Sequence, residues 1–182
     1  MKIRVLIVED EPPIARAIGQ LVAADPRFEV AGIEMNGYDA LGRFETTPID
    51  VVITDVNMPI MDGLSLAAYV EQHHPQVIKV VVSGYQKFEY AQEAIGYLVV
   101  EYLLKPVTKQ KVAALLDKLY AMWHRRKVET RTQEITRALD GQPVRTGGPA
   151  ENILLMLSAG FYWGAETHFS PAQVFWNSID LP

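Results

Sequence analysis

The sequence predicts a doubly wound α/β fold, in which five parallel strands alternate with five helices over about the first 125 of the 182 residues. Two observations support this fold class. Five short apolar runs recur along the chain, and the segments between them carry apolar residues at helical spacing. The run at 51–53 has no polar residue at alternate positions, which is typical of a strand buried on both faces of a parallel sheet.

The strands are expected where the apolar runs fall, and helices are expected between them. The predicted strands cover residues 3–8, 28–33, 51–54, 77–82 and 99–104. The apolar positions of the helices are Ile14, Ala17, Ile18, Leu21 and Val22; Ala40, Leu41 and Phe44; Leu66, Ala67 and Val70; Phe88, Ala91, Ala94 and Ile95; and Val112, Leu115, Leu116, Leu119, Met122 and Trp123. Local signals fix two boundaries: Pro12 suits the first turn of the first helix, and Asn36-Gly37 predicts a turn before the second.

The fifth helix is expected to continue past the domain. It is capped by Thr108, and no glycine or proline occurs between Val107 and Asp140. Beyond Trp123 charged residues dominate, which favours a solvated helical linker over a coiled coil. We therefore predict a first domain over residues 1–125, a helical and Gly/Pro linker over 126–148, and the start of an incomplete second domain, or a tail, over 149–182.

Composition narrows the class of protein. The chain has 22 acidic and 17 basic residues, a net charge of −5 and 49% apolar residues, so no general attraction to nucleic acid is expected. It has no cysteine, which excludes disulfides and thiolate metal sites. We find no signal peptide and no run long enough to span a bilayer. A cytoplasmic protein without a membrane partner is expected.

Three acids stand where two buried strands end. Glu9 and Asp10 follow the first strand, and Asp55 follows the third. The carboxyl edge of an open α/β sheet is where such folds bind ligands, and clustered carboxylates suit a hard cation such as Mg²⁺. Ser83 and Lys105 follow two further strands and offer a hydroxyl and a positive charge to a phosphate group. The simpler alternative is that Asp55 only caps the next helix.

These residues resemble the receiver domain of two-component response regulators. The resemblance covers about residues 2–125 and rests on an ordered set of motifs at the strand ends: Glu9-Asp10, Asp55, Met58-Pro59, Asp62-Gly63, Ser83-Gly84, and Lys105-Pro106 preceded by Tyr102. The stretches around Ser83-Gly84-Tyr85 and 101–107 are most similar to the YesN-type subgroup, whose members usually carry an AraC-type DNA-binding domain. The resemblance implies a flavodoxin-like sheet with strand order 2-1-3-4-5.

The resemblance also implies roles for the acids. Asp55 matches the phosphoacceptor and Asp10 the direct Mg²⁺ ligand. Glu9 matches the acid that reaches the metal through water, and Asn57 would offer its backbone carbonyl as a further ligand. Glu11 is taken as a charge at the start of a helix rather than as a third ligand.

Other matching residues are implied to sense or tune phosphorylation. Lys105 matches the lysine that pairs with the phosphoryl group, and Ser83 the switch hydroxyl that turns toward it. Tyr102 matches the aromatic switch residue, although core packing alone would also explain it. Asn57 and Tyr85 fall where side chains influence the rate of dephosphorylation.

The implied function is a switch rather than a turnover enzyme. A sensor histidine kinase would phosphorylate Asp55, and a homodimer face on the fourth helix, fifth strand and fifth helix would respond. Transcription would be controlled through a DNA-binding domain outside these residues. One departure affects that face: Leu98 stands where the subgroup has the glycine that ends the fourth helix, so we expect a reshaped helix end.

Three other functions fit these residues less well. A phosphorylation-independent receiver-like interaction module would not need the full acid set. A phosphatase using Asp55 often carries a second aspartate two residues on, where this chain has Asn57. A flavodoxin-like cofactor domain would need a phosphate-binding loop after the first strand, where Glu9, Asp10 and Glu11 would repel phosphate.

Overall fold

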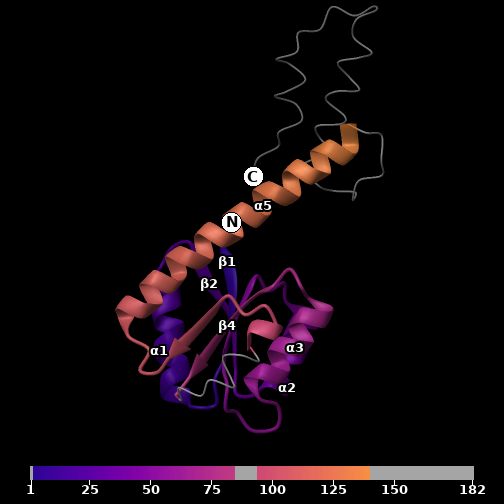
Figure 1. Cartoon of the computed structure of the whole chain (residues 1–182). Helices are drawn as coiled ribbons and strands as arrows, with labels where there is room; N and C mark the ends of the chain where they lie inside the picture. Colours follow the sequence, from indigo (N-terminus) through magenta and orange to yellow (C-terminus); the bar gives the residue numbers. More distant parts are fainter. Residues whose placement is uncertain (1, 85–93, 140–182) are drawn as a thin grey trace, which may run out of the picture. The chain divides into compact units, whose positions relative to one another are not determined.

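The computed structural model describes residues 2–84 and 94–139 and contains a five-stranded parallel sheet flanked by helices (Figure 1). Its elements are β1 (Ile3–Val8), α1 (Pro12–Ala23), β2 (Phe28–Glu34), α2 (Gly37–Thr46), β3 (Val51–Asp55), α3 (Gly63–His73), β4 (Ile78–Ser83), β5 (Glu101–Leu104) and α5 (Lys109–Leu139). The strand order is β2-β1-β3-β4-β5, so the predicted fold class and sheet order are confirmed. Most of the predicted fourth helix lies at 85–93, outside the described residues.

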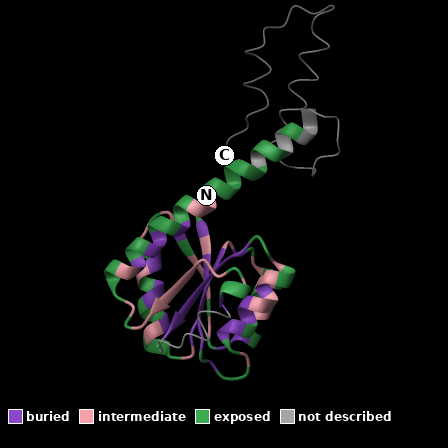
Figure 2. Cartoon of the chain, in the orientation of Figure 1, coloured by how far each residue is buried: buried purple, intermediate pink, exposed green. Residues whose placement is uncertain are grey.

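The core has two layers, one on each face of the sheet (Figure 2). Successive side chains of a strand point to opposite faces, so Ile53 packs toward α1 and α5 while Val52 packs toward α2 and α3. On the first face, Ile18 of α1 and Leu116 of α5 belong to the cluster, and on the second face Leu66 of α3 does. Helices on both faces explain why the strands carry uninterrupted apolar runs.

Polar side chains start three of the helices. The side chain of Asn36 accepts a hydrogen bond from the Asp39 amide at 2.9 Å, so the predicted Asn36-Gly37 turn is the N-terminal cap of α2. The Asp62 carboxylate accepts from the Ser65 amide at 2.7 Å at the start of α3. Thr108 accepts from the Lys111 amide at 3.3 Å, as predicted for α5.

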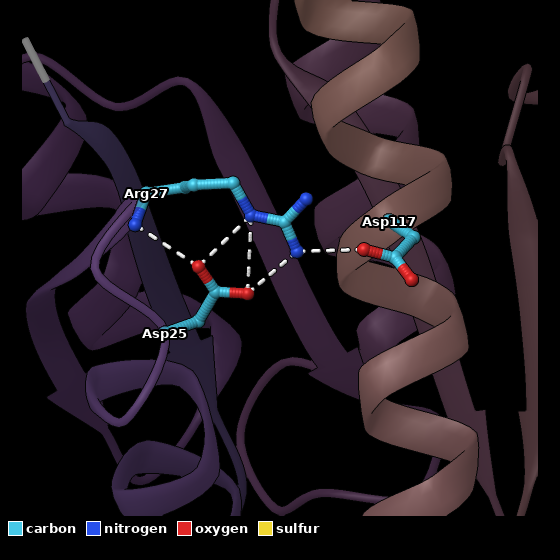
Figure 3. Close-up of polar contacts among 3 residues, drawn as sticks. All are labelled: Asp25, Arg27 and Asp117. Atoms are coloured by element: carbon cyan, nitrogen blue, oxygen red, sulfur yellow. Dashed lines mark hydrogen bonds and ion pairs between the residues drawn. The ribbon is translucent and has the colours of Figure 1, made fainter.

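Arg27 connects the turn after α1 to α5 (Figure 3). Its guanidinium donates to Asp25 at 2.6 Å and to Asp117 of α5 at 2.7 Å. The same group lies 5.0 Å from the centroid of the Tyr120 ring, within cation–π range. Polar and aromatic contacts therefore add to the apolar packing of α5 on this side of the sheet.

The end of the fourth helix differs from expectation. Leu98 has a φ of 53°, so a leucine adopts the left-handed conformation that glycine adopts without strain. The amides of Leu98 and Val99 donate to the carbonyls of Ile95 and Ala94, both at 3.1 Å, which is the hydrogen-bond pattern of a Schellman motif. The expectation of a reshaped helix end is therefore wrong: the cap is kept, with leucine in the glycine position.

The chain divides into two units between Trp123 and His124. The helix continues across this point to Leu139, as the absence of glycine and proline predicted. The described side chains from His124 to Thr130 are exposed. Within the described residues, no helix is both long and apolar enough to cross a membrane. The predicted linker at 126–148 is described only as far as Leu139, and the predicted second domain or tail at 149–182 lies outside the described residues. The predicted domain boundaries stay predictions.

Candidate functional site

The carboxyl edge of the sheet brings the predicted acids together. Glu9 and Asp10 follow β1, and Asp55 is the last residue of β3, which lies beside β1. One carboxylate oxygen from each of the three residues lies within 4.8 Å of the other two. The parallel pairing of β1 and β3 produces this proximity, because it aligns the ends of strands that are far apart in sequence.

Lys105 supplies the positive charge of the site. It follows β5, and its backbone amide donates to the Ser83 carbonyl at 2.8 Å. Its Nζ lies 2.9 Å from Glu9 Oε1 and 2.9 Å from Asp55 Oδ1. Glu9 and Asp55 are 1% and 5% exposed, so these ion pairs are shielded from solvent. A third carboxylate, that of Glu11, lies 3.5 Å from the same ammonium.

Burial and ion pairing shift the pKa values of Glu9 and Lys105 in the site. Burial raises the pKa of Glu9 above its usual value, and the hydrogen bond from Lys105 opposes this shift without cancelling it. Burial also acts to lower the pKa of Lys105, but the neighbouring carboxylates of Glu9 and Asp55 outweigh it, and the net shift is upward. The ammonium therefore stays charged while it is held against two buried acids.

The local backbone fixes the direction of the Asp55 side chain. Asp55 Oδ2 accepts a hydrogen bond from the Asn57 amide at 2.9 Å, and the Thr54 hydroxyl donates to the Asp55 carbonyl at 3.1 Å. The cap of α3 is Asp62, so the alternative in which Asp55 caps that helix is wrong. Asp55 instead presents Oδ1 to Lys105.

Gly63 allows α3 to start directly against the site. Its amide donates to the Val56 carbonyl at 3.0 Å. A Cβ at this position would lie 1.9 Å from the Asp55 carbonyl oxygen, far inside contact distance. The sequence marked Asp62-Gly63 as a motif but gave no reason for the glycine. The reason is the close approach of two backbone segments.

The predicted switch residues lie next to this cluster. Ser83 is completely buried at the end of β4. Tyr102 of β5 pairs in register with Val81 and packs, half-buried, against the cluster that contains Val56. These positions place both residues near the site, and their switching roles stay predictions. Asn57 is exposed, its carbonyl role is equally untested, and Tyr85 lies outside the described residues.

The donor set fits a hard divalent cation. Carboxylate oxygens are the ligands that Mg²⁺ prefers, and the site has three carboxylates within reach of one another. Glu9 Oε2 is buried without a hydrogen-bond partner, which is costly unless another group satisfies it. Asp10 is half-buried at the opening of the cluster and borders solvent. Glu9, Asp10 and Asp55 could therefore hold Mg²⁺.

The chain also matches a known protein family. A model of the response regulator receiver domain matches residues 5–117 of the chain. The match includes all three acids, Ser83 and Lys105.

Relatives and solved structures agree with that match. A transcriptional regulatory protein of Bacillus subtilis, YesN, is 34% identical over 139 residues, covering 75% of this chain and 38% of YesN. The regulator YpdB of Escherichia coli is 26% identical over 165 residues, covering 91% of this chain and 66% of YpdB. The receiver domain of AraT, a response regulator from Geobacillus stearothermophilus, is 34% identical with a TM-score of 0.65, covering 70% of this chain and 99% of that domain. The chain thus spans less than two thirds of the length of YesN and of YpdB.

Proposed function

The chain belongs to the response regulator receiver family, and from this premise we propose that it is a phosphorylation switch in which Asp55 accepts a phosphoryl group from a sensor histidine kinase. The observation that carries the proposal is the placement of Lys105 Nζ 2.9 Å from Asp55 Oδ1, with Glu9 and Asp10 beside it. A buried carboxylate held against a fixed cation can act as a nucleophile toward phosphorus. The proposed role is that of a signalling switch, not of a turnover enzyme.

The proposed chemistry is one phosphoryl transfer. A carboxylate oxygen of Asp55 attacks phosphorus, and a P–O bond forms as the P–N bond to the donor imidazole breaks. The electron pair of the broken bond stays on the imidazole nitrogen. Lys105 offsets the negative charge of the phosphoryl oxygens, and the Asn57 amide keeps the Asp55 side chain oriented for attack.

We propose Glu9, Asp10 and Asp55 as the residues that hold Mg²⁺, with the Asn57 carbonyl as a further ligand. When bound, the ion supplies positive charge that lets an anionic donor approach an anionic site. The unpaired Glu9 Oε2 and the proximity of the three carboxylates support this assignment.

The proposed output follows from the position of the switch residues. Ser83 ends β4 and Lys105 follows β5, so both flank the site, and Tyr102 lies on β5 beside the apolar cluster that contains Val56. Phosphorylation would bias these side chains between two arrangements and change the surface formed by the fourth helix, β5 and α5. We propose that this surface mediates dimerisation.

We propose transcription as the process that is controlled. YesN and YpdB are named transcriptional regulatory proteins, and this chain spans only part of each. DNA binding is therefore assigned to a domain outside the described residues.

Intact-protein mass after incubation with acetyl phosphate tests the switch directly. The wild-type chain should gain one phosphoryl group in the presence of Mg²⁺ and none when the ion is chelated. Asp55→Asn is the matched control and should gain none under either condition. Circular dichroism of both proteins establishes that they are folded.

Each outcome has a clear meaning. A Mg²⁺-dependent adduct that disappears in Asp55→Asn supports the proposal. A folded wild-type protein that takes no phosphoryl group overturns it and favours the phosphorylation-independent interaction module.

A further inference from the structure

Lys105 is shared by three carboxylates rather than two. Glu9 and Asp55 are buried and lie 2.9 Å from its Nζ. Glu11 lies 3.5 Å away, and its side chain is 61% exposed. Glu11 is therefore the outer acid of the group, on the side of Lys105 that faces solvent.

The start of α1 explains why this side chain is available. Glu11 occupies the N-cap position, but its carboxylate makes no capping hydrogen bond. The next two residues are Pro12 and Pro13, which have no amide hydrogen to donate. The first amides of the helix, from Ile14 and Ala15, donate instead to the Glu11 backbone carbonyl at 3.0 Å. With no donor left for it at the cap, the carboxylate lies near Lys105.

We propose that Glu11 is a specificity-determining residue that disfavours small, doubly charged phosphodonors at this site. The inference rests on the proposed phosphorylation of Asp55. Asp55 is buried beside Lys105, and the exposed carboxylate of Glu11 lies against the same ammonium, so a donor that pairs with Lys105 comes close to the charge of Glu11. Coulomb repulsion scales with the product of the charges, so a dianion is repelled about twice as strongly, in free energy, as a monoanion.

Two phosphodonors of different charge distinguish repulsion by Glu11 from a general change in the reactivity of the site. Acetyl phosphate is a dianion at neutral pH, whereas phosphoramidate is a monoanion that contains the P–N bond of a phosphohistidine. At saturating Mg²⁺, Glu11→Gln should raise the labelling rate with acetyl phosphate by about 3–10-fold and the rate with phosphoramidate by about 2–3-fold. The difference should shrink at high ionic strength, because salt screens an exposed charge.

Two variants serve as matched controls. Glu11→Asp keeps the charge and should keep the wild-type ratio of the two rates. Glu45→Gln removes one exposed negative charge at the far end of α2 and should change neither rate. Calorimetric titration with Mg²⁺ gives a readout independent of labelling: Glu11→Gln should bind the ion several-fold more weakly, because one nearby negative charge has been removed.

The outcomes separate this inference from the proposed function. An equal acceleration with both donors would show that Glu11 only restrains Lys105, and it would overturn the specificity role. Unchanged rates with both donors would overturn it as well. If the wild-type chain accepts no phosphoryl group from either donor, the proposed function itself fails, whatever Glu11 does.

Discussion

The backbone amide of Val99 donates to the carbonyl of Ala94 at 3.1 Å, and the chain can close this contact only by passing through Leu98 in a left-handed conformation, with a φ of 53°. The side chain of Leu98 contributes little to the core, because the residue is 64% exposed. A strained backbone is thus combined with a side chain that gains little from burial.

Replacing Leu98 with glycine should stabilise the domain. The left-handed conformation costs a leucine about 1–2 kcal/mol, whereas the greater freedom of glycine in the unfolded chain costs about 0.5–1 kcal/mol. The net gain for Leu98→Gly is therefore about 0.5–1 kcal/mol, measured by urea denaturation. Leu98→Ala keeps the strain and should give no such gain. A glycine variant less stable than wild type would contradict the assignment of strain to this residue.

Asp50 should make stability depend on pH. It accepts hydrogen bonds from the backbone amide and the guanidinium of Arg4 at 2.9–3.2 Å, and its pKa also reflects a hydrogen bond from Trp123. Burial alone would raise the pKa of Asp50, but these bonds outweigh it and hold the pKa below its usual value. A pKa that is lower in the folded state adds stability above the unfolded-state pKa, and that stability is lost as the pH falls.

Asp50→Asn should therefore cost about 1–3 kcal/mol at pH 7, by loss of charge-assisted hydrogen bonds. The difference from wild type should begin to narrow below about pH 5, where the unfolded chain takes up the proton, and should keep narrowing as the pH falls through the lowered pKa of the folded state. Urea denaturation across this pH range measures both curves. Asp117→Asn, at a side chain that is 70% exposed, is the control and should cost under about 1 kcal/mol. Parallel curves for Asp50→Asn and wild type would refute the linkage.

Gly63→Ala should damage both stability and the site. Its Cβ would lie 1.9 Å from the Asp55 carbonyl oxygen, so either α3 or the end of β3 must move. We expect a loss of about 2 kcal/mol or more in unfolding free energy and a slower phosphorylation of Asp55. Gly42→Ala is a matched control in α2, where a Cβ would meet nothing within 4 Å. That variant should be stabilised by about 0.5–1 kcal/mol.

Removing either partner of the ion pair between Lys79 and Glu71 should have unequal effects on stability. Lys79 lies on β4 with a side chain that is 3% exposed, and it pairs with Glu71 of α3, which is 28% exposed. Glu71→Gln leaves a buried ammonium without its partner and should cost about 1–3 kcal/mol. Lys79→Met removes that charge and should cost less than about 1 kcal/mol. Thermal denaturation of the two variants shows which one loses more stability. A larger loss for Lys79→Met than for Glu71→Gln would show that the ion pair itself is strongly stabilising.

The sequence predicted the sheet well because the three central strands, β1, β3 and β4, are buried on both faces. Val51, Val52 and Ile53 alternate between two apolar layers, so an unbroken apolar run was the expected pattern. The predicted ends of the strands were less accurate where local hydrogen bonds determine where a strand begins. The last strand starts at Glu101 rather than residue 99, because Val99 is used in the helix stop at Leu98.

The candidate site was predictable in composition but not in its contacts. The strand ends carried Glu9, Asp10 and Asp55, and parallel pairing was enough to bring them together. The position of Glu11 near Lys105 was missed, because it depends on two prolines that remove the donors a capping carboxylate would use. The positions of the strand ends indicate which acids meet at the site. The contact between Glu11 and Lys105 depends instead on the local backbone at the start of α1.

The ion pair between Lys105 and Glu9 joins residues 96 positions apart in the chain. During synthesis β1 and β3 emerge before β5, so the acids of the site can meet before the lysine that neutralises them has been made. Partly folded forms without β5 therefore carry unbalanced negative charge, and closing the long loop between Glu9 and Lys105 costs entropy before their contact can stabilise the chain. The electrostatics of the site consequently disfavour intermediates and should make the unfolding of this domain cooperative.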